Sequence, residues 1–407
     1  MLVGSPRHSE NARDSGSPYP LEMASTQTDE STTTSSLSDY TDVPIVEKAL
    51  GTYVSLYAGA GGLDIGFALA GFAPVWVSEL DPFALESHNR VFKDLAAKRP
   101  HLGSVSYESV VGDLLAVPDS ELPRRGSADL VIGGPPCQGF SVAGKMDPND
   151  ERSKHVFHFL DIVERVQPKA FVLENVKALY ENRRWAAIRD GLRERADALG
   201  YDTLLTLANA SHFGVPQARE RMFLIGIKRG LGSPVDLKPT SSESLPTVRQ
   251  ALRQLPQYGE IGNDSLCTAK ITLAKTPVLR RSQFAGMLFN GAGRPLNLDA
   301  PSFTLAASMG GNKTPIIDQS LLVDSDSHSW VSNYHQALWA NENPADPEIP
   351  ASLRRLTVEE AAAIQTFPIG MDWAGPQSSR FRQIGNAVPP RLALAAAEAV
   401  KRALNLS

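Results

Sequence analysis

The chain has 407 residues, 42% hydrophobic and 21% charged, so it is long and apolar enough to bury a sizeable core and is not disordered throughout. Its 40 basic and 45 acidic residues leave a formal net charge of −5, so a nucleic-acid partner would have to be held by local basic patches. The longest apolar stretch, residues 67–77, is broken by Gly71 and Pro74, and the amino terminus lacks the pattern of a signal peptide. Two cysteines exclude a disulfide framework, so we expect a cytoplasmic protein without a metal or a membrane segment.

Composition and periodicity divide the chain into four regions. Residues 1–48 are rich in Ser and Thr and lack periodicity, which predicts a disordered tail. Residues 49–228 alternate β-prone runs with helical ones and predict the main domain. Residues 229–352 hold many Gly, Pro, Ser and Asn residues, which predicts a second, smaller, irregular domain. Regular structure returns in residues 353–407, which we expect to rejoin the main domain.

Short apolar runs in the main domain predict the strands of one sheet. These runs are 53–57, 73–77, 129–132, 170–173 and 222–227. Helical spacing of apolar residues from Val156 to Val166 predicts a helix that Pro168 ends. Strands that alternate with helices predict an α/β fold with a doubly wound, mostly parallel, Rossmann-like sheet covered on both faces.

Two helices are expected in the last region. Thr357 and Glu360 form a capping-box pattern for a helix that Pro368 stops. The last helix should begin after Pro389-Pro390 and run to about Leu404, because proline is well tolerated in a first helical turn.

A glycine-rich turn, Gly59-Ala60-Gly61-Gly62, follows the first strand and opens a helix, with the acidic Glu79 about 20 residues further on. In a doubly wound sheet such glycines let the backbone approach a nucleotide-like ligand, and the carboxylate can accept hydrogen bonds from ribose hydroxyls. A purely structural turn is the alternative interpretation. Asp113, after a further apolar run, either adds a ligand contact or caps its own loop.

A cysteine framed by glycine and proline, in Gly133-Gly134-Pro135-Pro136-Cys137-Gln138-Gly139-Phe140-Ser141, follows the strand at 129–132. The prolines fix the backbone just before a thiol at the carboxyl end of a strand, where such folds bind ligands. Buried structural cysteines are commoner in general, but this loop is a poor place for a core residue, which favours a nucleophile.

Charged residues accompany two further strands. Glu174 closes the strand at 170–173 and reaches the same rim as Cys137 if the two strands are neighbours; a capping glutamate is the alternative. In Gln217-Ala218-Arg219-Glu220-Arg221, alternation puts both arginines on one face. Paired guanidinium groups can bind an anion or steady a carboxylate, although an exposed ion-pair ladder would look the same.

These motifs, in this order, together with Arg382-Gln383-Ile384-Gly385-Asn386 near the end, resemble the cytosine-5 DNA methyltransferase family of bacterial restriction–modification type. The shared elements are Pro-Pro-Cys-Gln, Glu-Asn-Val, Gln-x-Arg-x-Arg and Gln-x-Gly-Asn, and the resemblance covers about residues 52–228 and the chain from Leu353 to the last helix. Tyr57 departs from the family, which commonly has phenylalanine there, but keeps the ring.

The resemblance implies transfer of a methyl group from S-adenosylmethionine to C5 of a flipped-out cytosine in a specific double-stranded DNA sequence, through a covalent adduct between cysteine and C6. The implied catalytic residues are Cys137, Glu174, Arg219 and Arg221. The implied cofactor contacts are Tyr57, Gly59, Gly61, Leu63, Glu79, Asp113, Pro136 and Asn386. The implied DNA contacts are Gln138, Ser141, Arg281 and Lys313, the last two in a target-recognition domain. We expect a monomer that needs no metal, with a cognate restriction endonuclease that acts separately.

Three alternatives remain open at this point. An NAD-dependent oxidoreductase would share the glycine-rich turn and Glu79 but gives no reason for the cysteine motif. A catalytically silent DNA-binding relative should lack Cys137 or Glu174, and both are present. A tRNA-directed member of the same family would use identical chemistry and differ only in its recognition domain.

Overall fold

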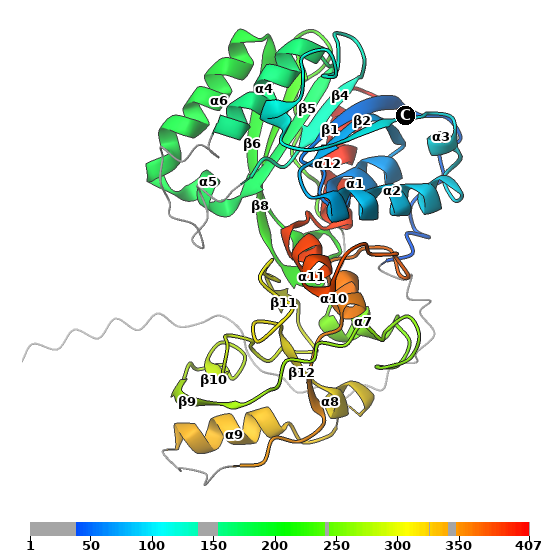
Figure 1. Cartoon of the computed structure of the whole chain (residues 1–407). Helices are drawn as coiled ribbons and strands as arrows, with labels where there is room; N and C mark the ends of the chain where they lie inside the picture. Colours follow the sequence, from blue (N-terminus) through cyan, green and yellow to red (C-terminus); the bar gives the residue numbers. More distant parts are fainter. Residues whose placement is uncertain (1–37, 137–153, 241–243, 325, 341–346, 407) are drawn as a thin grey trace, which may run out of the picture. The chain divides into compact units, whose positions relative to one another are not determined.

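A seven-stranded sheet organises the first half of the chain (Figure 1). Its strands are β1 (Gly51–Leu56), β2 (Phe72–Glu79), β3 (Glu108–Val111), β4 (Leu130–Gly133), β5 (Ala170–Val176), β6 (Tyr201–Asn209) and β8 (Glu220–Lys228). They lie in the order β3-β2-β1-β4-β5-β8-β6. The strands from β3 to β5 are parallel, whereas β8 runs antiparallel to both of its neighbours, β5 and β6. The carboxyl ends of the parallel strands therefore meet at one edge, which is where open α/β sheets bind ligands.

The computed structural model describes residues 38–136, 154–240, 244–324, 326–340 and 347–406 (Figure 1). These described residues belong to one compact unit. None of the helices within them is both long enough and apolar enough to cross a membrane.

Helices cover both faces of the sheet. Along β1, Tyr53 points into a buried cluster with α1 (Gly62–Leu69) and α12 (Pro390–Ala403), and the next residue, Val54, points into the cluster on the other face. That second face is covered by α4 (Lys154–Val166) and α6 (Ala186–Ala198) (Figure 1). Burial on both faces explains why these strands read as nearly continuous apolar runs rather than as alternating ones.

The remaining part of the chain is built from short elements. Between the sheet and the last helices lie α7 (Val248–Leu252), β9 (Leu273–Val278), β10 (Met287–Phe289), β11 (Ser302–Phe303), β12 (Ile316–Asp318), α8 (Gln319–Val323) and α9 (Trp330–Trp339). Two of these strands pair with strands on either side of the region: β11 with β7 (Gln217–Ala218) and β12 with β13 (Leu353–Arg355). Residues 229–352 are therefore built from short elements, and the region is tied at both ends to the chain around it.

Every strand and helix expected from the sequence is present, with two differences. The strand at 170–173 continues to Val176, so Glu174 lies within β5 and not after it. Outside residues 229–352, the strands and α-helices that were not expected are β3, β6, β7, β13, α2 (Pro82–Ala96), α3 (Pro100–Gly103), α5 (Lys177–Glu181), α6 and α11 (Gln377–Asn386). The expected mostly parallel sheet is confirmed, and β8 is the strand that runs against its neighbours. The expected capping box between Thr357 and Glu360 is confirmed at the start of α10 (Val358–Ile364), which is followed by α11 (Gln377–Asn386).

Residues 38–48, which we assigned to the disordered tail, are packed against the rest of the chain. The Tyr40 side chain is 3% exposed and donates a hydrogen bond to the backbone oxygen of Thr366. Asp42 accepts two hydrogen bonds of 2.8 Å from Arg391 at the start of α12. The tail assignment is therefore wrong over this stretch, because one buried ring and one ion pair anchor a segment whose average composition resembles a disordered one.

Candidate active site

One row of the sheet defines the position of the site. In the last paired row before the carboxyl edge, Ser78, Leu56, Gly133 and Leu173 stand side by side in β2, β1, β4 and β5. The residues that follow them in the chain are Glu79, Tyr57, Gly134 and Glu174. Three of the expected site residues, from segments up to about a hundred residues apart in the chain, therefore come to the same edge of the sheet.

Gly59 and Glu79 form the floor of an open space at this edge. The backbone N–H of Gly59 donates to Oε2 of Glu79 at 2.8 Å, and Asp81 N–H donates to Oε1 at 2.9 Å. Gly59 has a φ of +58°, and a Cβ atom added there would meet no other atom within 4 Å. Burial raises the pKa of the Glu79 carboxyl, opposed by these backbone hydrogen bonds. Each carboxylate oxygen keeps a lone pair for a further donor.

Gly61 is a glycine for a different reason. Its φ is +87°, and an added Cβ would lie 2.9 Å from Cδ2 of His88, a fully buried ring that contacts Asp64 at 3.3 Å. Leu63, another expected cofactor contact, is 5% exposed and packs in the core cluster beneath the turn. The turn therefore presents an open backbone at Gly59, while Gly61 and Leu63 fix it to the core.

Tyr57 lies beside the turn and contacts a residue that the sequence did not single out. Its hydroxyl group is 3.1 Å from Nδ1 of His155, in the first turn of α4, and the two rings meet edge to face at 5.5 Å. Tyr57 has a φ of +57°, the left-handed conformation that non-glycine residues seldom adopt. Asp113 accepts the N–H of Leu115, so the loop-capping interpretation holds, and its charge also acts on both Tyr57 and His155.

Two exposed apolar side chains follow the polar residues of this edge in the chain. Leu80, directly after Glu79, is 66% exposed, and Leu115, two residues after Asp113, is 45% exposed. A carboxylate beside an open backbone position at this edge is the kind of setting in which open α/β sheets bind polar ligands.

Glu174 lies in a buried, positively charged setting. Its carboxylate is 2.9 Å from Nε of Arg221, and a Cβ added at Gly134 would lie 2.8 Å from its Oε2. Burial raises the pKa of Glu174, and the charges of Arg221 and Arg219 oppose that rise. Arg221 contacts the Glu174 carboxylate directly, whereas Arg219 acts on it through its charge and donates its own hydrogen bonds elsewhere. A carboxyl with a raised pKa, in contact with a cationic group, can hold or release a proton at a ligand.

Arg219 also links separate parts of the chain. It is fully buried and donates to the backbone oxygens of Leu305, after β11, and Gly385, in α11, at 3.2 and 2.9 Å. Glu220, between the two arginines, pairs instead with Lys177 at 2.9 Å. An exposed ion-pair ladder is therefore excluded for Arg219, whose guanidinium group joins the irregular region to α11.

The backbone before Cys137 is held by β5. Nδ2 of Asn175 donates to the carbonyl oxygen of Pro135 at 3.1 Å, and Pro136 is half-buried at the last described position of this loop. Asn386 is exposed at the end of α11, one residue after the carbonyl that Arg219 contacts. Cys137 itself lies outside the described residues.

Two of the four expected DNA contacts lie within the described residues, and two lie outside them. Gln138 and Ser141 lie outside the described residues. Arg281 is exposed between β9 and β10, and Lys313 is exposed in the turn before β12. Both side chains are exposed to an anionic partner. Neither residue lies in or next to a strand of the seven-stranded sheet.

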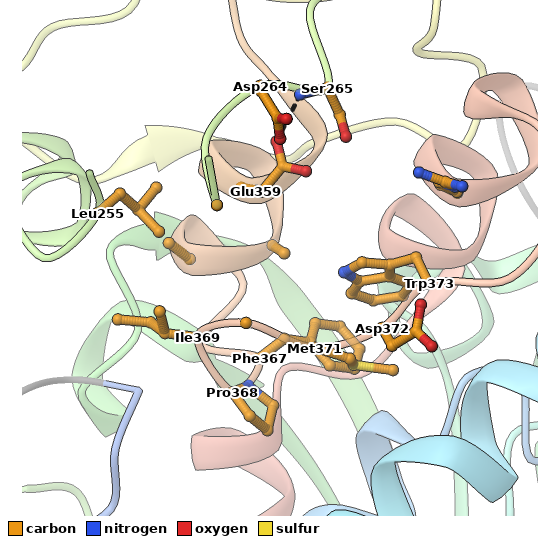
Figure 2. Close-up of a pocket in the computed structure, with 15 residues that line it drawn as sticks. Leu255, Asp264, Ser265, Glu359, Phe367, Pro368, Ile369, Met371, Asp372 and Trp373 are labelled. Atoms are coloured by element: carbon orange, nitrogen blue, oxygen red, sulfur yellow. Dashed lines mark hydrogen bonds between the residues drawn. The ribbon is translucent and has the colours of Figure 1, made fainter. Parts of the chain in front are cut away.

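A separate cavity has a volume of about 310 Å³, and Figure 2 shows the side chains that line it. It is lined by the acidic Asp264 and Glu359 and by apolar side chains that include Leu255, Phe367 and Trp373. None of the residues that line it belongs to the expected site.

Sequence reasoning missed two contributors. His155 contacts Tyr57 across 98 residues, and Lys177 pairs with Glu220 across 43. His155 stands in a run that reads only as an amphipathic helix, and no local pattern connects it with Tyr57.

Comparison with known proteins gives one consistent result. The family model described as C-5 cytosine-specific DNA methylase matches residues 51–402. Type II methyltransferase M1.HphI of Haemophilus parahaemolyticus is 33% identical over 355 residues, which are 86% of each chain. Type II methyltransferase M.XorII of Xanthomonas oryzae is 30% identical over 380 residues, with 86% of this chain and 84% of that protein covered.

Solved structures of lower identity share the fold. A prophage-encoded protein of E. coli, described as a DNA modification methyltransferase, is 22% identical with a TM-score of 0.59, covering 87% of this chain and 99% of its own. DNMT2 of Spodoptera frugiperda is 15% identical with a TM-score of 0.57 over the same shares.

Proposed function

Because this chain belongs to the C-5 cytosine-specific DNA methylase family, it is a DNA cytosine-5-methyltransferase, and we propose that it methylates a flipped-out cytosine in a specific duplex sequence, with S-adenosylmethionine as donor and Cys137 as nucleophile. The observation that carries the proposal is the Glu174 carboxylate, buried beside Arg221 and against Gly134, three residues before Cys137.

The open space at Gly59 fits S-adenosylmethionine. Glu79 would accept hydrogen bonds from the ribose hydroxyls, Gly59 would allow close approach, and the ring of Tyr57 would bound the site. Leu80 and Leu115 offer apolar surface to the adenine. Gly61, Leu63, Asp113, Pro136 and Asn386 complete the proposed contact set. When bound, this group supplies an electrophilic methyl carbon on a sulfonium.

The chain's own residues activate the cytosine. The thiolate of Cys137 adds to C6, forming a C–S bond and moving the electron pair of the C5–C6 double bond to C5. Glu174 holds a proton at N3, so that the ring accepts the electrons that arrive from sulfur. Once C5 has taken the methyl group and S-adenosylhomocysteine has left, a base removes the C5 proton. The C5–C6 double bond then re-forms, the C–S bond breaks to regenerate the thiolate, and the proton at N3 returns to Glu174.

The raised pKa of Glu174 suits this role. A carboxyl whose pKa is raised by burial keeps a proton more readily near neutral pH, and the Arg221 contact limits that rise so that the proton can still be shared. Arg219 would orient the base and Glu174, and Arg221 would hold the Glu174 carboxylate in place.

DNA engagement requires base flipping, because stacked neighbours shield C6 in a duplex. Gln138 and Ser141, close to the nucleophile in sequence, would contact the flipped site. Arg281 and Lys313 would contact phosphates or base edges from the irregular region, which would act as the target-recognition domain.

The biological role that we propose is protection of host DNA in a type II restriction–modification system. The relatives named above are type II methyltransferases, and a cognate endonuclease would act separately. The protein would work in the cytoplasm as a monomer, since one chain carries both the proposed catalytic and the proposed recognition residues.

Transfer of tritiated methyl groups from S-adenosylmethionine tests the proposal. We expect label in duplex DNA and none in tRNA, and loss of transfer in Cys137→Ser and Cys137→Ala. Cys267→Ser is the matched control, because it makes the same change at a thiol that is not among the proposed catalytic residues. That thiol lies in the irregular region, 3.6 Å from the hydroxyl of Thr314. Duplexes with 5-fluorocytosine at the target should trap the wild type covalently, since C5 then has no proton to lose. Label only in tRNA, or equal trapping of Cys137→Ala, would contradict the proposal.

A further inference from the structure

Tyr57 holds an unfavourable backbone conformation at the rim of the proposed cofactor site. A left-handed φ in a non-glycine residue destabilises the chain unless its surroundings fix it. The next residue, Ala58, donates its N–H to the Ser78 oxygen at 3.0 Å, which anchors the backbone toward β2. The side chain of Tyr57 is anchored in another direction, toward α4.

That second anchor is His155. The hydroxyl of Tyr57 lies 3.1 Å from Nδ1 of His155 and 3.4 Å from the backbone oxygen of the same residue. Burial raises the pKa of Tyr57, so its hydroxyl stays protonated and can donate. Burial lowers the pKa of His155, opposed by the charge of Asp113, so its ring is neutral near pH 7 and can accept.

We propose that His155 is a positioning residue for the cofactor site: its hydrogen bond with the Tyr57 hydroxyl fixes the Tyr57 ring and so preorganises the turn that receives S-adenosylmethionine. The inference rests on the proposed function. It also explains the departure from phenylalanine at this position, because only tyrosine supplies a hydroxyl for the imidazole. The charged and titratable groups that act on His155 are Asp113, after β3, and His158, one turn along α4.

Cofactor binding to the full chain, measured by titration calorimetry with S-adenosylmethionine and with S-adenosylhomocysteine, tests the pair. Tyr57→Phe removes the donor and keeps the ring, and His155→Leu removes the imidazole acceptor at 3.1 Å, leaving only the longer contact of 3.4 Å to the backbone oxygen. Loss of one hydrogen bond corresponds to a rise in Kd of about threefold to tenfold in each variant. The double variant should bind no more weakly than either single variant, because both substitutions remove the same interaction.

Two further variants separate positioning from general damage. His155→Asn places an amide where Nδ1 stood and should restore the affinity to within about twofold of wild type. His158→Leu removes the other histidine of α4, which pairs with Asp161 at 3.2 Å, and should leave Kd unchanged. In steady-state assays the KM for S-adenosylmethionine should rise in His155→Leu, while kcat and the KM for DNA stay constant.

The possible results are distinguishable. Additive losses in the double variant, or an unchanged Kd in His155→Leu, would overturn the role of His155 while wild-type binding upheld the proposed function. No binding of S-adenosylmethionine by the folded wild type would contradict the proposed function itself. Urea unfolding of each variant identifies any that fails to fold, and Tyr57→Phe and His155→Asn change so few atoms that the comparison between them remains decisive.

Discussion

Two glycines of one turn, Gly59 and Gly61, should respond differently to the same added methyl group. Both have positive φ, so alanine adds backbone strain of about 1–2 kcal/mol at either position. At Gly59 nothing lies within 4 Å of the new Cβ, and strain is the whole effect on folding. At Gly61 the methyl lies 2.9 Å from the buried ring of His88, which adds overpacking of about 1–3 kcal/mol.

Binding should rank the two variants in the opposite order to stability. Gly59→Ala places its methyl in the open space where we propose that S-adenosylmethionine lies, so Kd should rise more than tenfold, or about 1.4 kcal/mol. Gly61→Ala should lose about 2–5 kcal/mol of unfolding free energy, and the fraction that remains folded should bind more tightly than Gly59→Ala.

Urea unfolding followed by tryptophan fluorescence gives the stabilities, and titration calorimetry gives the affinities. Wild-type affinity in Gly59→Ala would refute the placement of the cofactor at Gly59. Equal losses of stability in the two variants would refute the steric argument at Gly61.

Other predictions address the base pocket, the amino-terminal segment and pH. Glu174→Gln should lower kcat about 10²- to 10⁴-fold with the Kd for S-adenosylmethionine unchanged, since the proton at N3 is lost; single-turnover assays check this. Tyr40→Ala should lower the free energy of unfolding by about 3–5 kcal/mol, and Tyr40→Phe by only about 0.5–1.5 kcal/mol, because it loses just the Thr366 hydrogen bond; urea unfolding checks both. Burial lowers the pKa of His155 below the ordinary histidine pKa of about 6.5. Acidification should therefore weaken cofactor binding only below about pH 6.5, where the protonated ring can no longer accept the proton of the Tyr57 hydroxyl group. Calorimetry of the wild type and of His155→Asn over this pH range checks the prediction.

Local patterns predicted the sheet because its inner strands are buried on both faces. The runs at 53–57, 129–132 and 170–173 are apolar almost throughout, and no competing periodicity obscures them. β6 was not predicted because it is an edge strand. Only Tyr201 and Ala208 of its nine residues are buried, so its sequence lacks a continuous apolar run. The amphipathic helix α2 carried a usable start signal in Asp81-Pro82, where the Asp81 side chain accepts the N–H of Phe83.

Residue identities at the site were also predictable, but their partners were not. Glu79 and Glu174 were recognisable because each is the acidic residue that follows a short apolar run, toward the strand end where open α/β sheets bind ligands. The contacts of Arg219 with Leu305 and Gly385 span 86 and 166 residues, and no local spacing encodes them. The same holds for Tyr57 and His155.

The direction of β8 decides whether the arginine motif can reach the site at all. Arg221 is the second residue of β8, so in a parallel strand it would lie at the amino edge of the sheet, a strand's length from Glu174. Because β8 runs antiparallel to β5, Val176 pairs with Arg221 and Glu174 with Phe223, and the start of β8 lies at the edge where β5 ends. The guanidinium group can then reach the carboxylate at 2.9 Å. Arg221 can therefore meet Glu174 only because one strand of the sheet is reversed. That reversal is a long-range feature of the fold, and the local pattern of residues 217–221 does not contain it.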